Sequence, residues 1–289
     1  MADSKLPHRD YASGTLMTWC PGCGDFGVLY AIQTALKSLK IDQKDVLVSS
    51  GIGCSSNLPH FMNTYGFHGI HGRSLPFAAG AKLGNRELTV IATGGDGDGY
   101  GIGVGHFVHA CRRNIDFTYI IMNNQIYGLT TGQVSPTSEI KMRTKTTPKG
   151  NIESPINPLA LALASGASFV ARGYTGHIDQ LIFLAEEAIK HKGFALLDVI
   201  SPCVTYNRKN TYDFFAKRAY SLQKEGHATD NLEQAVTKAY EWGERIPLGL
   251  FYQKQRPTYD ELDFGTQHGP LKDRAKPLEN PDELFKGYT

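Results

Sequence analysis

Residues 88–124 read LTVIATGGDGDGYGIGVGHFVHACRRNIDFTYIIMNN, and this stretch decides the fold class. The apolar run at 88–93, rich in β-branched residues, predicts a buried strand, and the glycines after it predict a sharp turn. A helix-like stretch at 106–113 leads to a second buried strand at 117–122. A strand, a helix and a second strand in this order are typical of a parallel sheet.

The same alternation extends to both sides of this stretch. Further strands are predicted at 45–49 and 195–200, and further helices at 26–39, 158–164 and 178–191. We therefore predict an α/β fold with a mostly parallel sheet flanked by helices. Ligands of such sheets bind at the carboxyl ends of the strands, where the glycine-rich and polar loops of this chain are expected to gather.

The pattern weakens after about residue 206. We predict one domain over residues 1–210 and a C-terminal extension over 211–289 that packs on this domain or on a partner subunit. The segment 135–157 is polar and holds three prolines, so it is expected to form a long ordered loop or lid. Residues 253–289 are polar with four prolines and are expected to form a C-terminal arm.

Composition excludes several classes of protein. The 289 residues are 41% hydrophobic and 20% charged, as in globular proteins, and the net charge of +2 gives no sign of a nucleic-acid surface. No run approaches the roughly 20 apolar residues of a membrane span. The polar start lacks the apolar core of a secretory signal, so we expect a cytoplasmic protein whose five cysteines are metal ligands, catalytic thiols or buried residues.

The glycine loop at 94–99, GGDGDG, can approach a phosphate closely. A carboxylate in such a loop would repel a phosphate unless a cation lies between them, so Asp96 indicates a diphosphate bridged by Mg²⁺. Asn124, one strand later, offers a neutral oxygen to the same cation. The chain lacks the GxxxxGK[ST] of nucleotide-binding P-loops, the stretch has no GxGxxG, and DGDG lacks the later oxygens of an EF-hand. For the loop alone, a simple glycine-rich turn remains an alternative.

The stretch TWCPGCG at 18–24 has three interpretations: a redox dithiol, half of a zinc site, or the first anchor of an iron–sulfur cluster. A thioredoxin-like dithiol reads WCGPC and follows an apolar strand, and neither holds here. Structural zinc normally takes a second ligand pair, for which only the histidines at 60, 68 and 71 are available.

Two further cysteines favour the cluster. Cys54 and Cys203 each directly follow a predicted strand. With Cys20 and Cys23 they make four thiolates, the number that a [4Fe–4S] cluster takes. Cys111 lies inside a predicted helix and is expected to be a buried thiol.

Over about residues 15–210 the sequence resembles the β subunits of 2-oxoacid:ferredoxin oxidoreductases, with a weaker echo at 249–262. GDG, a helix, a strand and NN form the thiamine diphosphate signature of that family, which also carries WCPGCG, SGIGCS and a late cysteine after a strand. The resemblance implies a thiamine diphosphate-binding fold. It also implies oxidative decarboxylation of a 2-oxoacid with coenzyme A, with electrons passing through a [4Fe–4S] cluster to ferredoxin, reversible toward CO₂ fixation.

The resemblance also assigns residues. Mg²⁺ would be held by Asp96, Asn124 and the Ile126 carbonyl, and the cluster by Cys20, Cys23, Cys54 and Cys203. Thiamine diphosphate would be contacted by Ile52, Gly53, Cys54, Ser55, Leu75, Gly97, Asp98, Gly128 and Leu129. The candidates for contact with substrate are His71, Arg73 and Asn57.

The chain departs from the family pattern at two positions. Many relatives have Lys where this chain has Asn57, and often Lys or Gly where it has Thr131. The segment YGLT at 127–130 is more similar to 2-oxoglutarate-using than to pyruvate-using relatives. No glutamate suited to activating the cofactor is found, so the resemblance implies a separate α subunit and an α2β2 enzyme. Two alternatives stay open: a non-redox thiamine diphosphate-dependent decarboxylase subunit, and a redox-sensing cluster module.

Overall fold

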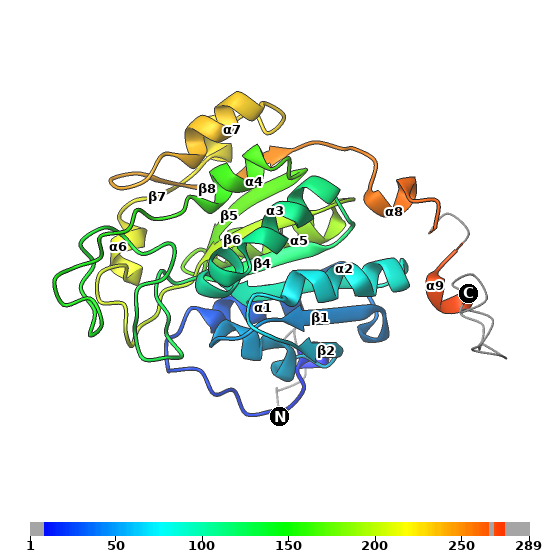
Figure 1. The fold of residues 1–289 in the computed structure, drawn as a ribbon, viewed down its shortest axis with the longest axis horizontal. Coiled ribbons are helices and arrows are strands. Elements are labelled where there is room, and N and C mark those ends of the chain that lie inside the picture. Colours follow the sequence, from blue (N-terminus) through cyan, green and yellow to red (C-terminus); the bar gives the residue numbers. More distant parts are fainter. Residues whose placement is uncertain (1–8, 266–268, 275–289) are drawn as a thin grey trace, which may run out of the picture.

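The computed structural model describes residues 9–265 and 269–274. Within them one eight-stranded sheet has the order β2-β1-β3-β4-β6-β5-β8-β7 (Figure 1). All neighbouring strands are parallel except β5 and β8, which are antiparallel. The strands are β1 (Val46–Ser50), β2 (Tyr65–His68), β3 (Thr89–Gly95), β4 (Thr118–Asn123), β5 (Phe169–Tyr174), β6 (Ala195–Ile200), β7 (Ala219–Ser221) and β8 (Ile246–Gln253).

Helices cover both faces of the sheet. One face packs against α1 (Asp25–Ser38) and α5 (Ile178–Lys190), which also contact each other. The other face packs against α2 (Ser74–Gly84), α3 (Val104–Arg113), α4 (Pro158–Ala164) and α7 (Leu232–Ala239). Three short helices complete the α-helices of the described residues: α6 (Tyr212–Ala216), α8 (Tyr259–Leu262) and α9 (Leu271–Arg274).

Strand β4 shows why the middle of the sheet reads as a continuous apolar run. Its side chains alternate between two cores: Ile120 and Met122 lie under α1 and α5, while Tyr119 and Ile121 lie under the helices of the opposite face. A strand buried on both sides needs apolar residues at every position. The predicted α/β class with a mostly parallel sheet is therefore confirmed.

The four predicted strands correspond to β1, β3, β4 and β6, and the four predicted helices to α1, α3, α4 and α5, with small shifts at their ends. The prediction missed β2, β5, β7 and β8, the helix α2, and the helices α6 to α9 that follow residue 210. β5 has the sequence FVARGY, and its Arg172 and Gly173 hide the apolar pattern although all six residues are buried.

The predicted C-terminal extension contributes to the sheet. β8 pairs with β5, and β7 pairs with β8, so residues 219–253 continue the sheet begun by residues 46–200. The domain boundary at residue 210 stays a prediction. The segment 135–157 has neither helix nor strand, and its first residues are buried.

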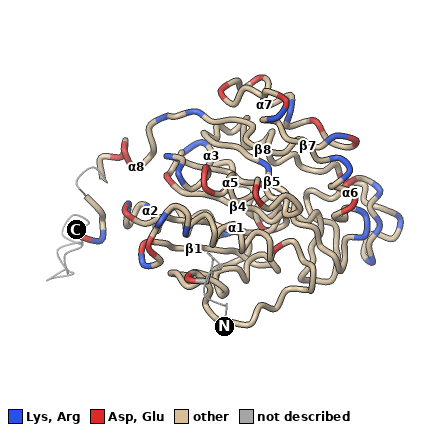
Figure 2. Tube along the Cα trace, turned by 180° about the vertical axis from the view of Figure 1, so that it is seen from behind, with Lys and Arg blue, Asp and Glu red and all other residues tan. Residues whose placement is uncertain are grey.

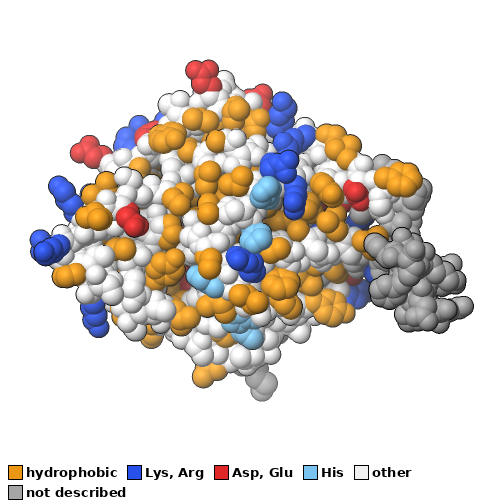
Figure 3. Space-filling view, in the orientation of Figure 1, with side chains coloured by type: hydrophobic (Ala, Val, Ile, Leu, Met, Phe, Trp, Pro, Cys, Tyr) orange, Lys and Arg blue, Asp and Glu red, His pale blue; other side chains and the backbone are white. Residues whose placement is uncertain are grey.

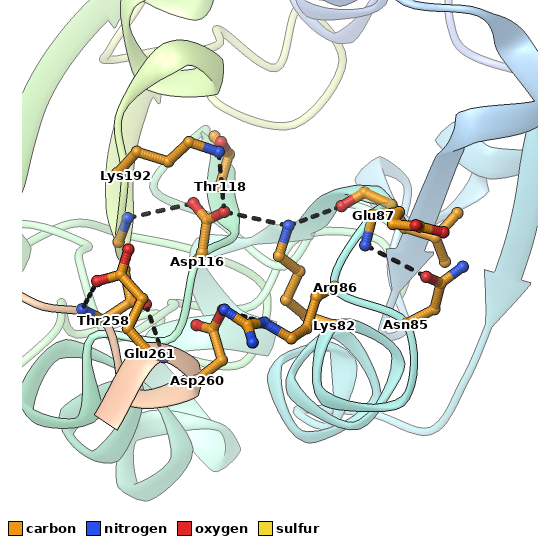
Figure 4. Close-up of polar contacts among 12 residues, drawn as sticks. Lys82, Asn85, Arg86, Glu87, Asp116, Thr118, Lys192, Thr258, Asp260 and Glu261 are labelled. Carbon is orange, nitrogen blue, oxygen red and sulfur yellow. Dashed lines mark hydrogen bonds and ion pairs between the residues drawn. The ribbon is translucent and has the colours of Figure 1, made fainter. Parts of the chain in front are cut away.

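The arm packs against the amino ends of the strands through a polar cluster (Figure 4). Asp116 forms ion pairs with Lys82 (3.1 Å) and Lys192 (3.4 Å), and Arg86 reaches Asp260 in α8 (3.3 Å). The parts of the predicted arm at 266–268 and 275–289 lie outside the described residues.

Charged residues lie mostly on the outer helices and connecting loops, while the middle of the sheet is almost free of them (Figure 2). Arg172 in β5 and Asp198 in β6 are exceptions, and both are buried. No helix in the described ranges combines the length and apolar character needed to cross a bilayer.

Candidate functional site

A cavity of about 540 Å³ lies at the carboxyl ends of β1, β3 and β4. Three loops supply most of its lining: residues 52–55 after β1, 95–98 after β3, and the chain from Asn124 to Val134 after β4, with His71 beside them. Ile52 and Leu129 also line the cavity and are partly exposed, at 39% and 53%. Neighbouring parallel strands thus bring together the glycine loop and the asparagine, as the sequence predicts.

The backbone of the glycine loop passes directly under the Tyr127 ring, so no side chain fits at Gly97. A Cβ on Gly97 would lie 2.1 Å from the Tyr127 ring, and the Tyr127 hydroxyl donates to the Gly97 carbonyl (3.2 Å). Residues Gly97–Ile102 form a π-helical turn that is kinked at Gly101. Such turns are frequent at functional sites, and this one sets the loop against the cavity.

Asp96 is buried at the base of the cavity. Its Oδ2 accepts hydrogen bonds from the hydroxyls of Ser135 (2.5 Å) and Thr137 (2.6 Å). Burial raises the pKa of Asp96 to about 6, and these two bonds oppose the rise. The two hydroxyls occupy Oδ2 and leave Oδ1 as the candidate ligand of a cation, whose charge would stabilise the buried carboxylate.

Asn124 and Ile126 also line the cavity. The Asn124 side-chain oxygen accepts a bond from the Ile126 backbone N–H (3.1 Å), and Asn207 donates to the Asn124 carbonyl (2.9 Å). The chain between the two predicted ligands is therefore held in a tight turn. A carboxylate, a carboxamide and a carbonyl are the hard oxygen donors that Mg²⁺ takes, so this donor set fits that ion.

Asp98 ties two loops together. Its Oδ1 accepts from the backbone N–H of Ile52 (2.9 Å) and Gly72 (2.7 Å) and contacts His71 Nδ1 at 2.9 Å. A Cβ on Gly51 would lie only 2.1 Å from the same oxygen, so glycine is required there. Burial raises the pKa of Asp98, and these hydrogen bonds oppose the rise. Asp98 thus positions the cavity wall.

The loop that carries Cys20 and Cys23 is fixed beside Cys203. Gly24 N–H donates to the Pro202 carbonyl (3.2 Å), and a Cβ on Gly24 would lie 2.5–2.7 Å from atoms of Ser201. The Ser201 hydroxyl in turn donates to Asp25 Oδ1 (2.7 Å). The start of α1 is therefore pressed against the end of β6.

The sulfur atoms of Cys54 and Cys203 both lie close to Gly128. A Cβ on Gly128 would lie 3.7 Å from the Cys54 sulfur and 3.6 Å from the Cys203 sulfur. Trp19 Nε1 donates to the Cys54 carbonyl (2.6 Å), which holds the Cys20 loop near the same wall. The predicted cluster ligands thus gather at one side of the cavity that Gly128 lines.

Burial favours the neutral form of these thiols. Burial raises the pKa of Cys54 to about 11, and burial also raises that of Cys23, where the neighbouring Asp25 adds to the effect. Buried thiolates need a cationic partner, which cluster iron supplies. In the described part of the chain no three His, Cys, Asp or Glu side chains are grouped around a single-metal position; a cluster of four irons and four sulfides is larger than one ion.

Three predicted residues do not line the cavity. Leu75, in α2, is 3% exposed and points into the core between this helix and the sheet. Asn57 lies in the 3-10 turn Ser55–Phe61, and Arg73 precedes α2 with its guanidinium on the Gly72 carbonyl (3.3 Å). His60 and His68, two candidates of the zinc interpretation, contact each other at 2.8 Å. Cys111 is fully buried, as predicted.

Sequence reasoning missed several residues that shape the site. Ser135 and Thr137, which bind Asp96, lie in the predicted lid, and no local pattern tells which part of that lid returns to the glycine loop. Asp25 directly follows CPGCG, and that position was the available signal. Tyr127 stands between two predicted cavity residues and could have been included for that reason.

Comparisons with known proteins agree with this site. Residues 51–199 match the family model described as thiamine pyrophosphate enzyme, C-terminal TPP binding domain. Residues 203–266 match the model for the C-terminal part of the pyruvate ferredoxin oxidoreductase beta subunit. The second match covers β7 and β8, two of the strands that the sequence pattern did not reveal.

Two similar proteins are named as subunits of enzymes that act on 2-oxoacids. The chain is 46% identical to a 2-oxoacid:ferredoxin oxidoreductase subunit beta of Saccharolobus solfataricus, over 93% of this chain and 95% of that protein. It is 41% identical to the 2-oxoglutarate synthase subunit KorB of Methanocaldococcus jannaschii, over 90% and 93%.

A solved structure agrees as well. It is the 2-oxoglutarate:ferredoxin oxidoreductase of Magnetococcus marinus with 2-oxoglutarate, coenzyme A and succinyl-CoA bound. It matches with a TM-score of 0.87 and 37% identity, over 100% of this chain and 97% of that one. The chain therefore belongs to the family of 2-oxoacid:ferredoxin oxidoreductase β subunits.

Proposed function

We propose that the 540 Å³ cavity binds thiamine diphosphate through Mg²⁺ held by Asp96, Asn124 and the Ile126 carbonyl, and that Cys20, Cys23, Cys54 and Cys203 hold a [4Fe–4S] cluster. When bound, the cofactor supplies an electron sink for loss of CO₂ and the cluster carries single electrons. The enzyme oxidises a 2-oxoacid with coenzyme A, reversibly toward CO₂ fixation, and ferredoxin takes the electrons.

One observation carries this proposal. Cys54 lines the cofactor cavity itself, and the Cys54 and Cys203 sulfurs lie close behind Gly128, another lining residue. A decarboxylase without a redox step needs the cavity but has no use for cysteines in its wall. A redox-sensing module needs the cysteines but not Asp96 and Asn124.

The chain's own residues have definite tasks in this proposal. Ser135 and Thr137 orient the Asp96 carboxylate toward the cation. Asp98 fixes the ring of His71 through Nδ1, so that Nε2 is the nitrogen available to a bound molecule. Roles for Arg73 and Asn57 stay predictions, because these residues act on the substrate only if they or their loops approach the cavity.

We propose 2-oxoglutarate as the substrate. The relatives from Methanocaldococcus and Magnetococcus are named for this acid, and YGLT at 127–130 lines the cavity. Asn57 carries no charge where many relatives have Lys, so a cation for the substrate carboxylate has to come from elsewhere.

We propose that an α subunit lies over the cavity mouth in an α2β2 enzyme. Apolar side chains are exposed close to it, among them Ile52 and Leu129, and Ile102 at the end of the π-helical turn Gly97–Ile102 is 57% exposed. Figure 3 shows histidine and basic side chains together near the middle of one face, with hydrophobic side chains around them. A mixed apolar and polar surface of this kind is typical of protein interfaces. A cytoplasmic location stays a prediction.

The first test is anaerobic iron and sulfide analysis of the enzyme, with an EPR spectrum after reduction by dithionite. We expect about four irons per β chain and a reduced [4Fe–4S] signal. Cys54→Ser should lose that signal together with electron transfer, while Cys111→Ser, which changes a buried thiol outside the site, should keep both. An iron-free enzyme that decarboxylates normally would favour the non-redox alternative.

The second test varies the acid. With the α subunit, coenzyme A and an artificial one-electron acceptor present, 2-oxoglutarate should give a higher kcat/KM than pyruvate. Faster turnover of pyruvate would contradict the substrate proposal and leave the cofactor assignment intact.

A further inference from the structure

A second cavity of about 510 Å³ lies beside the cofactor cavity and shares no lining residue with it. The chain at the end of β4 and just beyond it, residues 123–126, separates the two cavities, because successive residues line opposite sides. Asn124 and Ile126 line the first cavity, whereas Asn123 and Gln125 line the second. A volume of this size suits a small organic molecule.

Among the residues that line this second cavity, the cationic group is the guanidinium of Arg172. The side chain comes from the middle of β5 and is 3% exposed. Its Nε and Nη1 have no hydrogen-bond partner among the described residues. Arginine carries five N–H donors and stays charged, so donors left without partners in the interior destabilise the protein unless a further molecule accepts from them.

Asp198 does not satisfy this arginine. The distance from Arg172 Nε to Asp198 Oδ2 is 3.7 Å, which is an ion pair but longer than a hydrogen bond. The carboxylate instead accepts from the Tyr100 hydroxyl (2.9 Å) and the Asn123 amide (3.2 Å). Both of these bonds are on Oδ1, and Oδ2, the oxygen nearer Arg172, accepts only a 3.5 Å bond from Asn123. Asp198 therefore offsets the charge of Arg172 but leaves its Nε and Nη1 without a hydrogen bond among the described residues.

The rest of the lining is mainly apolar. Trp242 lies over the guanidinium, with 5.1 Å from the Arg172 Cζ to the ring centroid, and Ile140, Ile156 and Tyr240 lie around the opening and walls. The other acid at the rim, Glu139, is bound by Lys209 and Asn210 and so is already neutralised.

We propose that this cavity is a second ligand site, and that it binds a small monocarboxylate whose apolar body packs on Trp242 and Ile140 while its carboxylate accepts from Arg172. Guanidinium and carboxylate are matched in charge and geometry, and burial strengthens their interaction. The site is separate from the cofactor cavity, so it does not require the cofactor assignment to be correct.

The test is isothermal titration of the assembled enzyme with 3-phenylpropionate, compared with 3-phenylpropylamine, which has the same body and the opposite charge. We expect the acid to bind at one site per β chain and at least tenfold more tightly than the amine. Arg172→Met should weaken the acid at least tenfold. Arg245→Gln, which changes an exposed arginine that also stacks on an aromatic ring, should not.

A second variant covers the case in which Arg172→Met does not fold. Ile140 is 47% exposed, so Ile140→Glu should fold normally while placing a negative charge at the opening. It should weaken the acid at least fivefold and leave the amine unchanged or tighter. The proposal is overturned if the wild-type enzyme binds no acid at about 10 mM, as when water alone fills the cavity, if acid and amine bind equally, or if Ile140→Glu leaves binding of the acid unchanged.

Discussion

Gly24 controls how the first two cysteines approach the end of β6. Its Cα lies so close to Ser201 that no side chain fits between them. We expect Gly24→Ala to push the Cys20 loop away from Cys203 and to lower both the iron content and the free energy of unfolding, by about 2 kcal/mol or more. Iron analysis and chemical denaturation of the purified enzyme measure the two effects.

Gly80→Ala is the matched control. Gly80 lies inside α2 with no atom within 4 Å of its would-be Cβ, so alanine should keep the iron and raise stability by about 0.5–1 kcal/mol through its better helix propensity. Equal iron content in both variants would contradict the steric explanation.

Asp25 and Asp96 make the stability of the cofactor-free protein depend on pH. Burial raises the pKa of each from 3.8 to about 6. Because the folded protein then binds protons more tightly than the unfolded chain, stability should fall as pH rises from about 4 to about 6 and stay level above, by up to about 3 kcal/mol per group. Urea denaturation across this pH range measures the slope.

The same slope reports on the cation at Asp96. Mg²⁺ with thiamine diphosphate should remove the Asp96 part of the slope, because the cation stabilises the charged carboxylate. Asp96→Asn should remove that part without any cofactor. A slope that Mg²⁺ and thiamine diphosphate leave unchanged would place the cation elsewhere.

At the scale of elements, the helix α2 and the start of β4 are joined by a buried ion pair. Lys82 is 6% exposed, lies 3.1 Å from Asp116 and also donates to the Leu88 carbonyl (2.9 Å) (Figure 4). Asp116→Ala leaves the ammonium of Lys82 buried without its carboxylate, so we expect a loss of about 3–5 kcal/mol in chemical denaturation.

Lys192 provides the comparison on the same carboxylate. Its side chain is 72% exposed, and an exposed pair contributes little, so Lys192→Ala should lower stability by less than about 1 kcal/mol. Similar losses in the two variants would show that burial of Lys82 is not what makes its ion pair matter.

The segment 135–157 shows what an element-scale prediction can and cannot say. Its prolines and polar composition predict a loop without helix or strand, which the structure confirms. The hydrogen bonds of Ser135 and Thr137 to Asp96 join residues about 40 positions apart, and no local pattern carries that information.

At the scale of the whole molecule, β8 determines whether the sheet is complete. It covers the edge of β5 and buries Leu248 and Phe251. We expect a chain that ends at residue 210 to aggregate, because the β5 edge and the apolar surface under β8 would be exposed. A chain that ends at residue 265 should keep the far-UV circular dichroism and melting curve of the full chain. A folded 1–210 fragment would support the boundary predicted from sequence.

Local sequence alone determined the α/β class, the central strands and the motifs of the cofactor cavity. A strand buried on both faces is apolar at every position, and GDG and NN lie at the ends of such strands, so both can be read from adjacent residues. For the same reason the edge strand β2 and the arginine-containing β5 escaped detection, since their residues do not show an uninterrupted apolar run.

Only the tertiary structure decided which distant residues meet. The order β3-β4-β6 brings Cys203 beside Gly128 and Cys54, the Gly24 contact brings Cys20 and Cys23 to them, and the pairing of β5 with β6 buries Arg172 beside Asp198. These contacts depend on strand order and on the packing of helices over the sheet. Both are set by the whole hydrophobic core, and neither is encoded in the spacing of any one motif.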